Sequence, residues 1–149
     1  MKRKLALVYG IAVVALLLAA CGTTADSAAP KKPAATEVSC EEFTSSAPPV
    51  AISRQLQVAT NDTFTLTLCS NASTGFSWET ARISDPAILQ LVDHKSEPPS
   101  TNELGAAGKE TWTFKALKPG ASTVALDYSR PWEGGEKGVW KFSVQVTVR

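Results

Sequence analysis

The sequence predicts an all-β domain, and three observations lead to this prediction. From residue 40 onward, apolar and polar residues alternate with a period of two, as in strands that bury one face. Turn residues separate these runs at the spacing of a two-sheet sandwich. After residue 21 no stretch of about 11 residues has a helical period, and β-branched and aromatic residues dominate the runs. We therefore expect two antiparallel sheets packed face to face, an immunoglobulin-like β-sandwich of about seven strands.

Seven runs account for these strands, and they cover residues 52–58, 63–69, 76–83, 88–92, 111–117, 122–128 and 140–149. The last run is the clearest, because its large apolar residues share one face: Trp140, Phe142, Val144, Val146 and Val148. In the second run Phe64, Leu66 and Leu68 point inward. Cys69 is therefore expected off the core face, where an N-terminal segment bearing Cys40 could be attached.

The first twenty residues have the pattern of a secretion signal. Lys2, Arg3 and Lys4 precede an apolar run that is shorter than the roughly 20 residues needed to span a bilayer. The run ends in Leu-Ala-Ala before Cys21, which resembles bacterial lipoprotein signals. The resemblance implies that residues 1–20 are removed and that a lipid on Cys21 holds the protein on a membrane of the bacterial cell envelope, outside the cytoplasm. An uncleaved anchor helix is the alternative.

The segment after the signal is expected to be a tether. Residues 21–39 are rich in Ala, Pro, Ser and Thr, and contain too few large apolar residues to offset the entropy of ordering them. One domain, residues 40–149, remains.

Removing residues 1–20 takes away three of the fifteen Lys and Arg and none of the fourteen acids, so the net charge becomes 12 − 14 = −2. This charge argues against a nucleic-acid partner, since phosphate binding needs clustered Lys and Arg.

Two cysteines are left once Cys21 carries a lipid. A disulfide between Cys40 and Cys69 is the leading interpretation for a protein outside the cytoplasm, with two free thiols or a metal pair as the alternatives. A metal site is disfavoured because His94, the only histidine, has no CxxC or HxxxH partner and is expected at the surface. No metal or other cofactor is expected.

Three connections are longer or more unusual than a hairpin requires. They contain residues 70–75, residues 97–108 and the Arg130-Pro131-Trp132 stretch. In a seven-strand sandwich with the usual threading these three connections meet at one end. Loops that gather on a rigid scaffold are a common binding surface.

The third connection contains an unusual tryptophan. Trp132 follows Pro131 and belongs to no strand period, so we expect it to be exposed, and exposed Trp is enriched among binding hot spots. Arg130 has two interpretations on sequence grounds, an ion pair with Glu133 or Glu136 and a contact with a partner protein.

The other two connections combine polar and small residues. Gly75 is expected to take a positive φ angle or to let a backbone approach closely. Three residues can stiffen the first connection by hydrogen-bonding their own backbone: Asn71, Ser73 and Thr74. In the second, Gly105 and Gly108 are expected to expose bare backbone for pairing with a partner, with a merely flexible loop as the alternative.

These connections carry motifs of a known family. Residues Asn71-Ala72-Ser73-Thr74-Gly75-Phe76 resemble an NPTTG-aromatic motif, Gly105-Ala106-Ala107-Gly108 resembles a GxGG motif, and Arg130-Pro131-Trp132 is an RPW motif. In this order and spacing they are similar to the chagasin-type inhibitors of papain-like cysteine peptidases. The resemblance covers residues 52–149.

The resemblance implies a function as well as a fold. It implies that three loops form a wedge that plugs the peptidase cleft reversibly, and that the protein is not an enzyme. We expect the protein to be a monomer. Ser73 and Thr74 would meet the catalytic Cys and His of the peptidase. On one side of the peptidase cleft, the backbone of the second connection would pair with the peptidase through Leu104, Gly105, Ala106, Ala107 and Gly108. Trp132 would lie on the other side of the cleft. The alternative is an immunoglobulin-like envelope module that binds a glycan or a surface protein through Trp132.

Three residues depart from the family motifs. Ala72 replaces a Pro, which is expected to loosen the first loop, and Ser73 replaces a Thr and lacks its methyl group. Ala107 replaces a Gly and adds a Cβ where the peptidase backbone would approach. Weaker binding or a different target is the expected consequence.

Overall fold

A computed structural model of the protein describes residues 33–45, 50–101 and 103–149. The expected signal sequence and Cys21 lie outside the described residues. The elements in chain order are β1 (Ala34–Val38), α1 (Cys40–Ser45), β2 (Val50–Val58), β3 (Thr63–Ser70), the 3-10 turn η1 (Ala72–Thr74), β4 (Ser77–Trp78), β5 (Arg82–Ile83), β6 (Leu89–Glu97), β7 (Gly108–Ala116), β8 (Gly120–Ser129) and β9 (Trp140–Val148).

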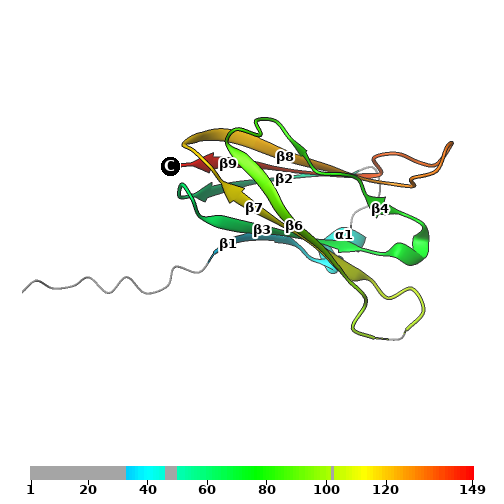
Figure 1. Cartoon of the computed structure of the whole chain (residues 1–149). Helices are drawn as coiled ribbons and strands as arrows, with labels where there is room; N and C mark the ends of the chain where they lie inside the picture. The colour runs from blue at the N-terminus through cyan, green and yellow to red at the C-terminus, as the bar shows by residue number, and fades with distance from the viewer. Residues whose placement is uncertain (1–32, 46–49, 102) are drawn as a thin grey trace, which may run out of the picture. The chain divides into compact units, whose positions relative to one another are not determined.

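The strands form two sheets that pack against each other, which confirms the all-β sandwich (Figure 1). One sheet has the order β1-β3-β7-β6, and the other has the order β2-β9-β8-β4, with β5 also paired to β8. The sheets are mixed rather than purely antiparallel, because β1 runs parallel to β3 and β2 runs parallel to β9.

The core follows the predicted alternation. Phe64, Leu66 and Leu68 have no exposed surface, and Phe64 stacks on Phe114 with ring centroids 5.1 Å apart. The apolar face of β9 is buried from Trp140 to Val148, as its period of two predicts. The free energy of folding therefore comes chiefly from apolar side chains of the two inner faces.

The number and limits of the strands differ from the prediction. The run 76–83 is interrupted and forms two short strands, β4 and β5, each of which pairs with β8. The run 88–92 extends to Glu97 as β6, with an irregularity between Leu91 and Asp93 where the pairing register shifts. This shift breaks the period of two, which is why the strand seemed to end there.

The N-terminal part is more ordered than expected. Residues 34–38 were assigned to the flexible tether, but they form β1, whose partners run from Phe64 to Leu68 on β3. Helix α1 has only six residues, so it is too short to show a helical period over about 11 residues. The described domain therefore begins before Cys40.

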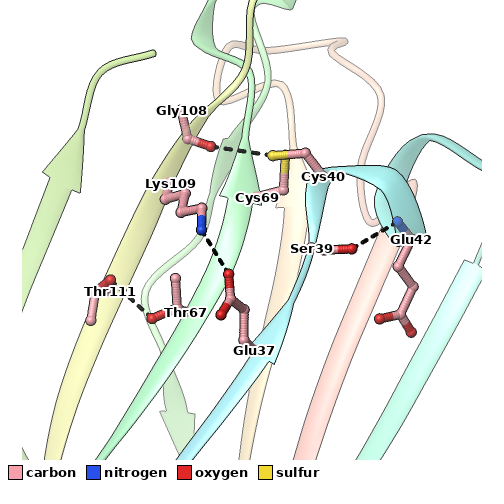
Figure 2. A network of polar contacts seen from close by, with 9 residues as sticks. All are labelled: Glu37, Ser39, Cys40, Glu42, Thr67, Cys69, Gly108, Lys109 and Thr111. Carbon is pink, nitrogen blue, oxygen red and sulfur yellow. Dashed lines mark hydrogen bonds and ion pairs between the residues drawn. A yellow bond between two sulfur atoms is a disulfide. The ribbon is translucent and has the colours of Figure 1, made fainter. Parts of the chain in front are cut away.

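The predicted disulfide between Cys40 and Cys69 is present, with an S–S distance of 2.07 Å (Figure 2). Cys69 does not lie outside the core as expected, since its exposed fraction is 1 % and it packs with the core residues. The segment that carries Cys40 covers it.

The two ends of the sandwich can be told apart by the chain direction. β3 and β8 end, and β7 and β9 begin, at one end, which we call the loop end. Figure 1 shows the long connections there, and the C-terminus at the other end with the short turns 59–62 and 117–119. Because Ala34 pairs with Phe64 at the start of β3, the described chain also begins at this opposite end.

Candidate functional site

Three connections make up the loop end. Loop 1 is residues 71–76, between β3 and β4; loop 2 is residues 98–107, between β6 and β7; and loop 3 is residues 130–139, between β8 and β9. They contain the family motif residues singled out in the sequence except Gly108, which is the first residue of β7.

Loop 1 is fixed by its own side chains, as predicted. The Asn71 carboxamide oxygen accepts hydrogen bonds from the Ser73 backbone N–H at 3.2 Å and from the Ser73 hydroxyl at 2.6 Å. The Thr74 hydroxyl donates to the Asn71 carbonyl at 2.6 Å. Gly75 ends the 3-10 turn with a φ of 77°, a conformation that suits glycine. The loop is thus ordered although Ala72 stands where the family motif has Pro.

A hydrogen bond joins loop 1 to loop 2. The Asn71 carboxamide nitrogen donates to the Gly105 carbonyl at 2.9 Å, and the Asn71 backbone N–H donates to the Tyr128 hydroxyl at 2.8 Å. Asn71 therefore connects three segments that are far apart in the sequence. Neither bond was foreseen, because a pairing this distant leaves no local pattern.

Loop 1 also touches loop 3. A Cβ added to Gly75 would lie 2.7 Å from Cη2 of Trp132, so the indole ring passes directly over this glycine. The positive φ expected for Gly75 is confirmed, and the group that approaches it closely is the indole side chain of Trp132 rather than a backbone. The Arg130 guanidinium lies 4.5 Å from the centroid of the Phe76 ring and 5.7 Å from that of Trp132.

Loop 3 closes on itself. Arg130 forms an ion pair with Glu136 at 3.2 Å, one of the two acids considered, and its backbone N–H donates to the Glu136 carbonyl at 2.8 Å. The Gly135 N–H donates to the Trp132 carbonyl at 3.1 Å. Trp132 is 51 % exposed, as predicted from its place outside any strand period.

Loop 2 presents a fully exposed leucine, Leu104, and the exposed Gly105, followed by the half-buried Ala106 and Ala107. The prediction that Gly108 exposes its backbone to a partner was wrong. It is buried and paired with Ser70, and a Cβ there would lie 2.2 Å from the Glu97 carbonyl oxygen. This glycine permits close packing inside the protein, and its backbone is not exposed to a partner.

A buried carboxylate beneath the loops was missed in the sequence. Glu110 accepts a hydrogen bond from the Ser70 hydroxyl at 2.7 Å, and its other oxygen lies 3.0 Å from Nε2 of His94. His94 is partly exposed and stacks on Trp112 with centroids 4.6 Å apart. Glu110 lies at a position of β7 where the alternation places side chains inside the sandwich. An acidic residue at an inward position was therefore the sequence feature that could have indicated a buried carboxylate.

The described residues include no group of three or more His, Cys, Asp or Glu placed to hold a metal ion. Among the same residues, no helix is both apolar and long enough to cross a membrane.

Comparison with known sequences identifies the family. Residues 57–146 match the family described as Chagasin family peptidase inhibitor I42. Amoebiasin-2 of Entamoeba histolytica is 32 % identical over 94 residues, covering 63 % of this chain and 76 % of that protein. Chagasin of Trypanosoma cruzi is 33 % identical over 94 residues, covering 61 % and 86 %.

Solved structures show the same fold. The crystal structure of the cysteine protease inhibitor EhICP2 from Entamoeba histolytica superposes with a TM-score of 0.54 and 27 % identity, covering 66 % of this chain and 94 % of that one. PbICP-C, solved in complex with falcipain-2, gives a TM-score of 0.61 at 15 % identity, covering 78 % and 99 %. The match to inhibitors agrees with the expectation that the chain is not an enzyme.

Proposed function

The chain belongs to the chagasin family of peptidase inhibitors, and we propose that it inhibits papain-like cysteine peptidases reversibly by filling their active-site cleft with loops 1, 2 and 3. The observation that carries the proposal is the linkage of the three loops into one surface. The hydrogen bond from Asn71 to Gly105 and the contact of Trp132 with Gly75 hold loops 2 and 3 against loop 1.

The roles of the loops follow from what each one exposes. Loop 1 would face the catalytic Cys and His with the hydroxyl-bearing residues Ser73 and Thr74, whose rotamers are already fixed by Asn71 and its backbone. Loop 2 would offer the Leu104 side chain and the backbone of residues 105–107 on one side of the cleft. On the other side Trp132 would supply a large rigid apolar contact.

The rigidity of the loop end favours tight binding. A surface whose hydrogen bonds are already formed loses little conformational entropy on docking, so more of the interaction free energy appears as affinity. The three departures from the family motifs act on this surface. The 3-10 turn at Ala72 and the bond from Ser73 to Asn71 maintain the order of loop 1, so Ala107, with its added Cβ, is the departure expected to affect binding most.

We extend the proposal to the location of the protein. A lipid on Cys21 would hold the domain on a membrane of the bacterial cell envelope. Support comes from the sequence pattern around Cys21 and from the position of β1, which starts at the end opposite the loops. Because the described chain begins at the end opposite the loop end, the point where such an anchor joins the domain does not lie among the loops.

The proposal is tested with the chain lacking residues 1–20 and carrying Cys21→Ser. Residual activity of papain and of cathepsin L is measured against increasing protein concentration, with recovery of activity after dilution as the check for reversibility. We expect complete and reversible inhibition of at least one of these peptidases at micromolar protein or below. Full peptidase activity at micromolar protein would contradict the proposal.

A further inference from the structure

Residues 33–45, which we call the N-terminal clamp, lie outside the residues that match the family. We propose that the clamp is a positioning element of the inhibitory surface, because it holds the bases of all three loops without reaching their tips. The inference rests on the proposed function, but it concerns residues to which the family motifs give no role.

Covalent and ionic contacts hold the clamp on the domain (Figure 2). β1 pairs with β3 from Ala34 to Val38, and Lys109 Nζ donates to the Glu37 carboxylate at 2.7 Å. The disulfide from Cys40 to Cys69 follows. On the far side of α1, Glu42 forms an ion pair with Arg54 of β2, so the clamp is attached to both sheets.

The disulfide acts on loops 1 and 2. Cys69 is separated from Asn71, the residue that organises loop 1, by Ser70 alone. The Cys40 sulfur lies 3.7 Å from the carbonyl oxygen of Gly108, the residue that follows loop 2. Figure 2 shows Gly108 beside the disulfide. The crosslink therefore fixes the strand end where loop 1 starts and packs on the strand end where loop 2 stops.

Phe43 acts on loop 3. Its ring stacks on Trp140 with centroids 4.3 Å apart and meets the edge of Tyr128 at 5.2 Å. Loop 3 starts two residues after Tyr128 and ends directly before Trp140. The Tyr128 hydroxyl in turn accepts the hydrogen bond from the Asn71 backbone N–H. One buried ring of the clamp thus supports both flanks of loop 3 and, through Tyr128, loop 1.

Phe43 also faces an open space between the loop bases. A cleft of about 380 Å³ lies there, and its lining includes Phe43, Phe76, Tyr128 and Trp140. Without the Phe43 ring this cleft would be larger, and the aromatic side chains around it could move. Loosening the loop bases raises the entropy lost on docking, which weakens binding mainly through faster dissociation.

The test uses two clamp variants and a matched control, all lacking residues 1–20 and carrying Cys21→Ser. The clamp variants are Cys40→Ser with Cys69→Ser, and Phe43→Ala. The control is Val58→Ala, which removes a buried side chain at the end opposite the loops. Dissociation constants and dissociation rates are measured with papain that has been activated and then freed of reductant. The temperature is one at which circular dichroism shows every variant folded.

We expect each clamp variant to raise the dissociation constant about tenfold, mostly through the dissociation rate, and Val58→Ala to leave it unchanged. Adding reductant is expected to break the disulfide of the parent chain and to raise its dissociation constant to that of the double Ser variant. The double Ser variant has no such disulfide, so its dissociation constant is expected to stay the same. Two folded clamp variants with the parent dissociation constant would overturn the inference, as would an equal loss for Val58→Ala.

Hydrogen exchange of the free proteins separates this inference from the proposed function. Faster exchange of the amides of residues 71–75, 103–108 and 130–138 in the clamp variants, but not in Val58→Ala, supports the clamp whether or not papain is inhibited. Unchanged exchange in Phe43→Ala would overturn it even if the double Ser variant fails to fold.

Discussion

The two ends of the sandwich connect their loops in different ways. At the opposite end the turns are short, and backbone hydrogen bonds close them, as between Asp62 N–H and the Ala59 carbonyl at 3.1 Å. At the loop end, side chains and aromatic rings connect the loops. Of the three exposed large apolar side chains among the described residues, Leu104 and Trp132 lie at the loop end and Val92 lies on β6. One end therefore only joins strands, and the other exposes the apolar side chains that we propose contact a peptidase.

The largest expected effect is on stability, from a residue near the opposite end. Phe64→Ala removes a fully buried ring that stacks on Phe114, and we expect the free energy of unfolding to fall by about 3–5 kcal/mol. The loops do not contain this residue, so the dissociation constant of the protein that remains folded is expected to stay within about twofold. Denaturant unfolding and papain titration measure the two quantities. A large loss of affinity would remove the distinction between the ends.

The converse change lies at the loop end. Trp132→Ala is expected to weaken peptidase binding by about 2 kcal/mol, roughly 30-fold, because an exposed Trp that becomes buried in an interface is a typical hot spot. The free energy of unfolding is expected to change by less than about 0.5 kcal/mol. Thermal unfolding alongside the inhibition constant checks both. A much larger loss of stability would make Trp132 a structural residue.

A smaller change tests the contact between loops 1 and 3. Gly75→Ala places a Cβ in a positive-φ position, at a cost of about 1–2 kcal/mol, and also against the Trp132 ring. Gly134→Ala is the matched control, since Gly134 has a φ of +73° and nothing within 4 Å of the added Cβ. We expect similar losses of stability, with a weaker inhibition constant for Gly75→Ala. Equal inhibition by the two variants would show that the contact with Trp132 does not matter.

The smallest effect concerns the ion pair that helps to attach the clamp. The hydrogen bond and the charge of Glu37 raise the pKa of Lys109 above its ordinary value of 10.5. A raised pKa stabilises the fold below 10.5, and this contribution is lost as the pH rises through the pKa of the folded state. The unfolding free energy is therefore expected to fall slightly more above pH 10.5 in the parent than in Glu37→Gln. Identical pH profiles would exclude a role for the pair.

Much of the core was predictable because its signals are local. The period of two located β3 and β9, and the position of Trp132 after Pro131 indicated its exposure. These features depend on residues that are neighbours in the sequence. The disulfide was indicated instead by the expected location outside the cytoplasm and by the two cysteines that remain once Cys21 is set aside. Each was found in the structure within the limits of the described residues.

The features that were missed depend on distant partners. β1 has the sequence Ala-Ala-Thr-Glu-Val, which gains its order from pairing with β3 and from the disulfide rather than from its own pattern. Gly108 looked like an exposed loop residue, but pairing with Ser70 and the approach of Glu97 bury it. Glu110 is stable inside because Ser70 and His94 bind both of its oxygens.

The most direct test of the central claim is hydrogen exchange of the protein with and without bound papain. The account predicts protection of amides in residues 71–76, 103–108 and 130–138 together, with no change in the turns 59–62 and 117–119. Protection of those turns or of an outer sheet face, or protection of a single loop, would contradict it.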